Sequence, residues 1–265
     1  MKTIEELIIS YISKGMTAFQ AENYVCQEII LNKISKSTMA NNVLIKGGVV
    51  MFNITHDLRR TTTDLDFDFI RYDISTDSIR IFVELLNRYD NQYKININKI
   101  EELHQEDYSG KRVWTTISDK TRSIRFKMDI GVHTLLAIDQ KDICFYFDDE
   151  NQFTLKVNPP EQIFAEKIYS IAKHGALSTR FKDIFDMYYF IEQKMMNKNV
   201  VRKCVELLTM KGNNNIRTLE DICDNVSATF EDAQYIANIK TTDDKWLDVD
   251  YSTIFKAILD YLYSI

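Results

Sequence analysis

Hydrophobic positions recur along the chain with two different periods, and the change between them divides the sequence. Apolar residues at helical spacing predict helices over residues 3–13, 18–35 and 75–88. Alternating apolar and polar residues predict strands over residues 64–69, 93–100, 113–117, 124–132, 143–147 and 153–157. Beyond residue 160 the spacing is helical throughout, with predicted helices over residues 161–174, 178–194, 198–210, 217–225, 229–239 and 251–264. We therefore expect an α+β protein in which a mixed sheet, with hairpins in its second half, precedes a helical C-terminal part.

The change of period coincides with Asn158-Pro159-Pro160. Proline is favoured in the first turn of a helix, and the apolar helix pattern begins directly after Pro160. Glycine and proline are scarce, with 7 and 2 residues, so we expect few long flexible linkers. We predict two domains, one of residues 1–158 and one of residues 159–265.

The segment from Lys46 to Phe69 contains the strongest candidate chemistry. Its second half, Asp64-Leu65-Asp66-Phe67-Asp68-Phe69, alternates acidic and apolar residues without a break. On a strand, the apolar residues would face the core and the three aspartates would share the other face. Two carboxylates placed two residues apart can converge on a hard cation such as Mg2+. The alternative is an acidic strand that is simply exposed to water.

The first half of the same segment suggests a phosphate site. Gly47 and Gly48 follow the short apolar run Val43–Ile45 and precede a predicted buried helix over residues 49–54. A strand, a glycine turn and the start of a helix together form an anion site, because backbone N–H groups and the helix dipole point toward it. By itself this half would indicate only a tight turn. Followed so closely by paired aspartates, it predicts a site for both phosphate and metal.

A third carboxylate is a candidate for the same site. Residues 123–131 alternate again, with Arg125, Lys127 and Asp129 on the polar face. If this strand neighbours the acidic one, Asp129 could be a third metal ligand or the base for an acceptor hydroxyl. The alternative is an exposed acid beside two exposed bases, and the spacing does not distinguish the two.

The predicted helices after residue 160 contain unusual charges. Lys167 lies in an otherwise apolar helix, and Arg180, Lys182, Asp183 and Asp186 are interspersed with aromatic residues. The expected buried stripe of the second helix consists of Phe181, Ile184, Phe185 and Tyr188. Asp183 and Asp186 fall off this stripe, and we expect them to pair on the surface with Arg180 and Lys182 respectively. The functional alternative is a cation near a triphosphate, with an acid that orients it.

Composition narrows the class of protein. The 265 residues are 45% hydrophobic and 27% charged, as in ordinary globular proteins, and the net charge of −6 argues against a surface that is basic throughout. Any nucleic-acid binding would need a local basic patch, for which Arg59, Arg60, Arg125 and Lys127 are candidates. The four cysteines form no CxxC pair, no apolar run is long enough to span a membrane, and the N-terminus is too acidic for a secretory signal. We expect a cytoplasmic protein without a membrane partner.

These motifs occur in a fixed order that resembles a known family. They are Gly47-Gly48, Arg60-Thr61-Thr62-Thr63-Asp64-Leu65-Asp66-Phe67, Lys127-Met128-Asp129, Glu166-Lys167 and Arg180-Phe181-Lys182-Asp183-Ile184-Phe185-Asp186. Together, over roughly residues 40–190, they resemble the AbiEii/AbiGii family of nucleotidyltransferase-like toxins. That family is the toxin half of type IV toxin–antitoxin and abortive-infection systems, which act in phage defence.

The resemblance implies a polymerase-β-like nucleotidyltransferase core followed by a helical C-terminal domain. It implies Mg2+-dependent use of an NTP, transfer of nucleotides to RNA (tRNA ends in some members), and neutralisation by a separately encoded antitoxin. Position by position, Asp64 and Asp66 match the metal-binding pair. Lys167 and Asp183 match the later essential lysine and acid, with Asp186 as the alternative acid.

The remaining candidate positions concern the nucleotide and the acceptor. Gly47 and Gly48 are expected to hold phosphate, although many nucleotidyltransferases have Gly-Ser there and this chain lacks that hydroxyl. Arg60, Thr62 and Lys167 are further candidates for binding the NTP. Two rival functions are transfer to a small molecule, such as an aminoglycoside, or to a protein side chain. A third is a non-catalytic module that only binds NTP or a protein.

Overall fold

A computed structural model describes residues 2–105, 108–135, 137–148, 151–211 and 215–265. The chain forms two compact units, one of Met1–Leu136 with Gln140–Val157 and the other of Ala137–Asp139 with Asn158–Ile265. The first unit contains a seven-stranded sheet and the second is built from helices, so the predicted α+β class is confirmed. The division into domains of residues 1–158 and 159–265 stays a prediction. Among the described residues, no helix is both long enough and apolar enough to cross a membrane.

The sheet of the first unit is mixed, as predicted. Its strands are β1 (Val43–Ile45), β2 (Leu65–Phe69), β3 (Lys94–Gln105), β4 (Tyr108–Ser118), β5 (Ser123–Val132), β6 (Lys141–Phe147) and β7 (Asn151–Val157). Their order is β3-β4-β5-β2-β1-β7-β6. β2 is parallel to β5 and antiparallel to β1, and β1 is parallel to β7. The pairs β3–β4, β4–β5 and β6–β7 are antiparallel hairpins, which places the predicted hairpins in the second half of the sheet.

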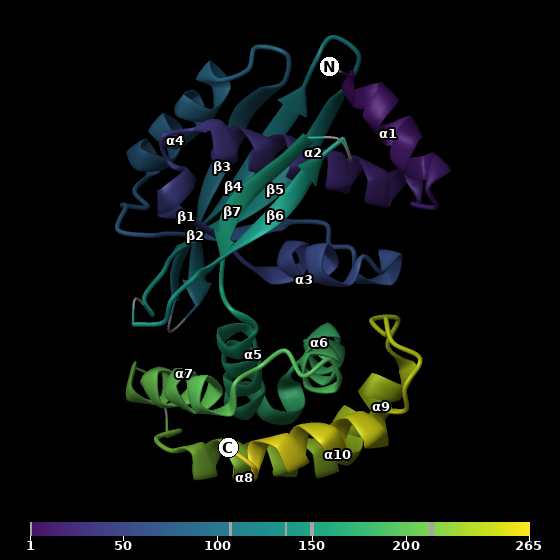
Figure 1. Ribbon diagram of the computed structural model, residues 1–265, viewed down its shortest axis with the longest axis vertical. Coiled ribbons are helices and arrows are strands. Elements are labelled where there is room, and N and C mark those ends of the chain that lie inside the picture. The colour runs from purple at the N-terminus through teal and green to yellow at the C-terminus, as the bar shows by residue number, and fades with distance from the viewer. Residues whose placement is uncertain (1, 106–107, 136, 149–150, 212–214) are drawn as a thin grey trace. The chain divides into compact units, whose positions relative to one another are not determined.

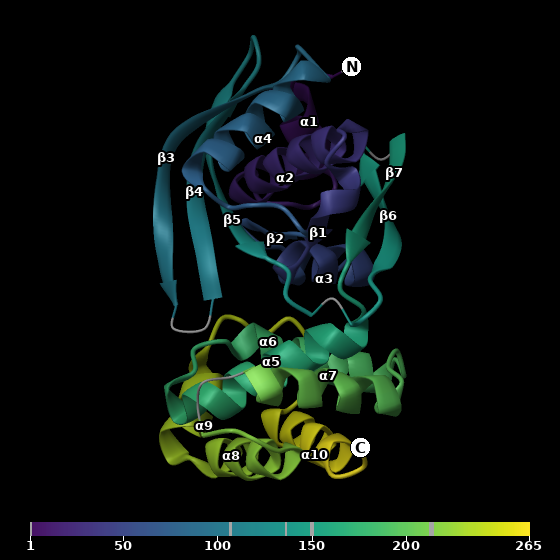
Figure 2. The same cartoon turned by 90° about the vertical axis from the view of Figure 1, so that its left-hand side faces the viewer.

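The described residues of this unit form the α-helices α1 (Ile4–Ser13), α2 (Ala18–Lys36), α3 (Gly47–Thr55) and α4 (Thr76–Arg88). Two short 3-10 turns accompany them, η1 (Ala40–Asn42) and η2 (Leu58–Arg60). α2 contacts β5 as well as β6 and β7, and α4 packs against β3 and α2. Figures 1 and 2 show both helices beside the sheet. The apolar face of β2 meets α4, since Phe67 and Phe69 both pack against Phe82. The acidic residues of β2 therefore face away from α4.

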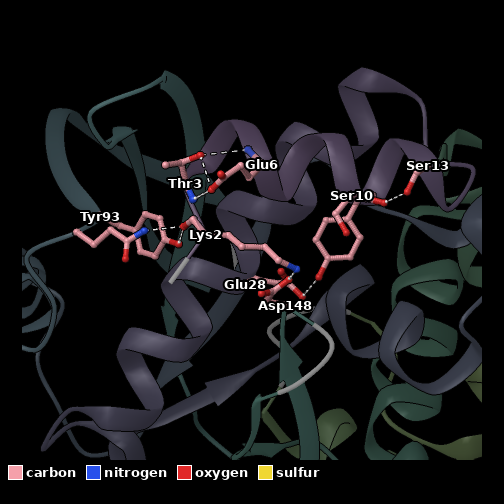
Figure 3. A network of polar contacts seen from close by, with 10 residues as sticks. Lys2, Thr3, Glu6, Ser10, Ser13, Glu28, Tyr93 and Asp148 are labelled. Carbon is pink, nitrogen blue, oxygen red and sulfur yellow. Dashed lines mark hydrogen bonds and ion pairs between the residues drawn. The ribbon is translucent and has the colours of Figure 1, made fainter.

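The N-terminus is fixed by a polar network around a buried acid (Figure 3). The Lys2 ammonium pairs with the Asp148 carboxylate at 2.5 Å, and the Tyr11 hydroxyl donates to Glu28 at 2.7 Å. Only 2% of Glu28 is exposed. Burial raises the pKa of Glu28 to about 8, with a further contribution from Asp148 and against the hydrogen bonds that Glu28 accepts. The helices at this end are thus organised around a carboxyl group that favours its protonated form.

The second unit consists of α5 (Pro160–His174), α6 (Phe181–Glu192), α7 (Lys198–Lys211), α8 (Leu219–Glu231), α9 (Ala233–Thr241) and α10 (Tyr251–Leu262), with the 3-10 turn η3 (Gly175–Leu177). The break predicted between residues 225 and 229 is wrong, because α8 continues through it. Ile222, Val226 and Phe230 keep one buried stripe across this point. α8 ends at Glu231, and the next residue, Asp232, caps the start of α9.

Candidate active site

Three carboxylates converge on the face of the sheet that points away from α4. Asp64 directly precedes β2, Asp66 lies within it, and Asp129 lies on β5. The parallel register pairs Asp66 with Asp129. One carboxylate oxygen from each of the three residues lies within 4.8 Å of the others. The third carboxylate that the sequence left open is therefore brought beside the Asp64–Asp66 pair.

The electrostatics of this acidic triad, Asp64, Asp66 and Asp129, fit a bound cation. Burial raises the pKa of Asp66 to about 6, and the charges of Asp64 and Asp129 add to the shift. Three anions held this close are unfavourable unless positive charge lies among them. Oxygen ligands of this kind are those that Mg2+ prefers, so the residues suit a magnesium ion.

Lys127 and Thr62 hold Asp64 in place. The Lys127 ammonium lies 2.9 Å from one carboxylate oxygen of Asp64, and the Thr62 hydroxyl donates to the other at 2.8 Å. Burial acts to raise the pKa of Asp64, but the hydrogen bonds from Lys127 and Thr62 outweigh it and leave the pKa below its ordinary value. Lys127 was a candidate for a basic patch, and the structure places it in direct contact with Asp64.

Arg112 was not predicted from the sequence. It lies on β4 directly opposite Asp129, and its guanidinium donates two hydrogen bonds to that carboxylate. The distances are 2.9 Å from Nε to Oδ1 and 2.7 Å from Nη2 to Oδ2. This paired geometry fixes the plane of the carboxylate as well as its position. The alternation of β4 shows that Arg112 faces outward with Trp114, but only the register between strands shows what Arg112 contacts.

Asp68, the last acid of β2, lies outside the triad. It is 2% exposed, and the Lys46 ammonium lies 2.9 Å from its carboxylate. The negative charge along this face is therefore compensated in two ways. Asp68 pairs with a lysine from the end of β1, and Asp64 pairs with Lys127.

The glycine turn lies against the triad. Gly47 opens α3 with φ of +67°, and a Cβ atom there would lie 2.4 Å from Oδ2 of Asp66. A Cβ atom on Gly48 would lie 2.6 Å from Cβ of Thr62 and 3.0 Å from a guanidinium nitrogen of Arg60. Glycine is thus required at both positions for the first turn of α3 to lie this close to Asp66, Thr62 and Arg60. The predicted phosphate-binding turn and the predicted metal ligands are neighbours in space.

The second unit holds its own charged cluster. The Lys167 ammonium on α5 pairs with both Asp183 and Asp186 on α6, at 2.9 Å from Oδ2 of Asp186. Arg180 also bonds to Asp183, and the Trp246 indole N–H donates to Asp186 at 3.0 Å. Burial acts to raise the pKa of Asp183, but the charges of Lys167 and Arg180 hold it below its ordinary value.

This cluster corrects the prediction for α6. Asp183 and Asp186 were expected off the buried stripe, yet they are only 6% and 0% exposed. The predicted Arg180–Asp183 pair is present, whereas Lys182 pairs with Asp244, at 3.7 Å, in place of Asp186. The reason is Lys167, which supplies positive charge from a neighbouring helix and so permits the burial of both acids.

The chain is similar to a known protein family and to solved structures. A family model described as "Nucleotidyl transferase AbiEii toxin, Type IV TA system" matches residues 29–260. A crystal structure of a candidate nucleotidyltransferase from H. pylori is 13% identical, with a TM-score of 0.50 and coverage of 91% of each chain. The crystal structure of JHP933 from Helicobacter pylori is 11% identical, with a TM-score of 0.48 and coverage of 94% of this chain and 93% of that one. No curated protein matches the sequence.

The two kinds of comparison support different statements. At 13% identity, the structural likeness shows a shared fold. The family model spans most of the chain, including every residue of the acidic triad and of the Lys167 cluster. The chain therefore belongs to the AbiEii family of nucleotidyl transferase toxins of type IV toxin–antitoxin systems.

Proposed function

We propose that this chain transfers a nucleotide from an NTP to an RNA acceptor, that tRNA is the expected acceptor, and that the reaction requires Mg2+. The observation that carries the proposal is the convergence of Asp64, Asp66 and Asp129 within 4.8 Å beside the glycine turn of α3. Nucleotidyl transfer needs a metal and a phosphate site next to each other, since the metal acts on phosphate oxygens. The triad and the turn offer this combination.

Asp64, Asp66 and Asp129 are the residues that would hold Mg2+. When bound, the metal would neutralise charge on the phosphates and make the acceptor hydroxyl a better nucleophile. Asp129 is assigned as a ligand in preference to a base, because the two hydrogen bonds from Arg112 make its carboxylate less basic and still leave a lone pair on each oxygen for a metal. Thr62 and Lys127 would keep the Asp64 carboxylate oriented toward the same point.

The triphosphate is assigned to the first turn of α3. The N-terminus of α3 has no side-chain cap hydrogen bond, so its first backbone N–H groups and the positive end of the helix dipole are offered to a phosphate. Arg60 lies close to Gly48 and is a candidate counter-charge for the triphosphate, with Thr62 beside it. The serine hydroxyl that many nucleotidyltransferases use at this turn is replaced here by glycine.

Lys167, Asp183 and Asp186 are proposed as the second group of essential residues. In this assignment Lys167 neutralises triphosphate charge, and the two aspartates hold its ammonium in one position. The pairing of Lys167 with both acids supports the positioning part of the proposal. Since a buried ion pair can also serve stability alone, activity per folded molecule decides between the two roles.

The acceptor can be identified directly. The purified chain is incubated with Mg2+, total RNA and each labelled NTP in turn, and the labelled species are separated. Label in a discrete RNA band, lost on chelation of Mg2+, is the expected result. Label that stays with added aminoglycosides or with protein would move the assignment to those acceptors. No turnover of any NTP would support a non-catalytic binding module.

Toxicity, which control by a separate antitoxin presupposes, is tested in cells. Expression of the wild-type chain alone should slow bacterial growth, and Asp64→Ala or Asp66→Ala should relieve the effect because transfer is lost. The variants matter as controls, since any overproduced protein can burden a cell. Equal inhibition by the wild type and both variants would contradict a toxic transferase activity.

A further inference from the structure

The outer face of strands β3, β4 and β5 carries a patch of cations around one exposed tryptophan. This outer-face patch consists of Lys99, Glu101, Arg112, Trp114, Arg125 and Lys127. We propose that it binds a single-stranded segment of nucleic acid and that Trp114 stacks on an unpaired base. The inference rests on the proposed function, because it assigns this surface to the acceptor strand.

Trp114 is exposed although its strand neighbours are buried. Val113 and Thr115 are 0% and 1% exposed, whereas Trp114 is 39% exposed. The alternation of β4 thus places a large aromatic side chain on the outer face, where most of the other outward-facing side chains are polar. Among the described residues, Trp114 takes part in no contact with another aromatic ring and no cation–π contact. An exposed ring without an aromatic partner is what base stacking requires.

A bulge in β3 arranges the residues next to this ring. The register between β3 and β4 shifts between Ile97 and Lys99, so that Lys99 lies opposite Trp114 and Glu101 lies opposite Arg112. A shift of one residue reverses the face to which side chains point, so without the bulge Lys99 and Glu101 would turn inward. Glu101 then accepts a hydrogen bond from the Trp114 indole N–H at 2.5 Å. This bond holds the ring by its edge, and Trp114 remains 39% exposed.

The charge of the outer-face patch suits a phosphate backbone. Three of its four cations already pair with acids, Lys99 with Glu101, Arg112 with Asp129 and Lys127 with Asp64, so Arg125 is the uncompensated positive charge of the patch. Lys127 lies opposite Trp114 on β5, and Arg125 precedes Lys127 by two residues on the same strand. Arg125 is exposed, and its guanidinium has no ion-pair partner within the part of the chain that the structure describes. A basic groove with an aromatic stacking residue is the usual arrangement for single strands.

The outer-face patch is continuous with the acidic triad. Lys127 contacts Asp64, and Arg112 contacts Asp129, so the two rows of side chains run directly into the proposed metal site. β4 is two strands away from β2, which corresponds to about 10 Å. A base stacked on Trp114 would therefore leave the neighbouring nucleotide near the triad. A duplex fits this arrangement poorly, because its bases already stack on one another.

Tryptophan fluorescence tests the inference without NTP or metal. The chain has two tryptophans, and Trp246 is only 1% exposed, so quenching by a ligand should report on Trp114. The probe is a short unstructured oligoribonucleotide, compared with the same sequence annealed into a duplex. We expect the single strand to quench the emission and to bind more tightly than the duplex.

Variants then assign the binding site. Trp114→Ala should weaken binding of the single strand, measured by anisotropy of a labelled oligonucleotide, by roughly five- to a hundredfold, whereas Trp114→Phe should retain most of it. Tyr146→Ala is the matched control, because Tyr146 is 38% exposed on β6 of the same unit. Unchanged binding in Trp114→Ala, equal quenching by the duplex, or no binding by the wild type would overturn the inference. If Trp114-dependent binding occurs but no NTP is transferred, the proposed function fails and the binding surface stands.

Discussion

Gly47 and Asp66 approach each other so closely that a side chain at position 47 is excluded. A Cβ atom on Gly47 would lie 2.4 Å from Oδ2 of Asp66, and the backbone of Gly47 has φ of +67°. The phosphate turn and the acidic triad are thus joined at one point of contact. Any change that enlarges Gly47 must move the carboxylate on which the proposed metal site depends.

Gly47→Ala should therefore lose most of its transfer activity, by at least about tenfold, as a displaced metal ligand would. The positive φ alone should lower the free energy of unfolding by roughly 1–2 kcal/mol. Gly15→Ala is the matched control: Gly15 has φ of +99°, and its added Cβ would meet only Leu58 at 3.4 Å. We expect both variants to be less stable by chemical denaturation but only Gly47→Ala to lose activity. Full activity in Gly47→Ala would contradict the claim that a side chain at position 47 displaces the Asp66 carboxylate.

Arg112 is expected to matter through Asp129. Arg112→Gln removes the two hydrogen bonds that orient this carboxylate, and loss of such a partner commonly costs about 10–100-fold in metal affinity or activity. Lys111→Gln serves as the control, since Lys111 is the preceding residue of β4 and pairs with the exposed Glu102. Binding of Mn2+, followed by electron paramagnetic resonance, and the rate of transfer are measured for both. If Arg112→Gln and Lys111→Gln behave alike, Arg112 does not position Asp129.

Much of the proposed site could be predicted because it is local in sequence. The period of two in residues 64–69 places Asp64 and Asp66 on one face of a strand, whatever the rest of the fold. The glycine turn and the short helix after it are likewise contiguous. Helix caps are local for the same reason: the Thr17 and Ser75 side chains accept hydrogen bonds from the first turns of α2 and α4.

The remaining features depend on register and packing, which the sequence does not encode locally. Asp129 meets Asp66 only because β5 pairs with β2 in one parallel register, and Arg112 meets Asp129 only through the register of β4. The burial of Asp183 and Asp186 depends on Lys167 from another helix. A pattern analysis that assumes charged residues lie outside therefore placed these two acids on the surface.

Glu28 should make stability depend on pH. Its pKa is raised from an ordinary value of 4.5 to about 8, so the folded protein retains a proton that the unfolded chain releases. This contribution to stability is complete below about pH 4.5 and is lost as the pH rises through about 8, by at most about 1.4 kcal/mol per pH unit. Glu28→Gln should remove that slope in urea unfolding measured across the range. Parallel stability curves for the wild type and Glu28→Gln would show that Glu28 is not protonated in the folded state.

Lys167→Ala should destabilise the second unit. It leaves Asp183 and Asp186 buried without Lys167, and breaking a buried ion pair from one side typically costs about 3–5 kcal/mol. Lys173→Ala, on the same helix, should cost less than about 1 kcal/mol. Adding Asp186→Asn to Lys167→Ala should restore part of the lost free energy of unfolding, because one uncompensated charge is removed.

Activity per folded molecule of Lys167→Ala then addresses the proposed role in NTP binding. We expect the activity per folded molecule to fall and the NTP concentration needed for half-maximal activity to rise. If stability falls and activity per folded molecule is unchanged, Lys167 serves the fold alone.

The most direct test of the proposed activity is the transfer of label from an NTP to RNA by Asp66→Asn compared with the wild type. An amide cannot replace the anionic ligand, so transfer in the presence of Mg2+ should be abolished. The variant should remain folded, because burial and the neighbouring Asp64 and Asp129 already disfavour the charge on Asp66. Asp142→Asn, an exposed acid on β6, is the control and should label RNA like the wild type. Label in RNA with the wild type and none with folded Asp66→Asn is the predicted result, whereas equal labelling by the two would contradict the proposed metal site.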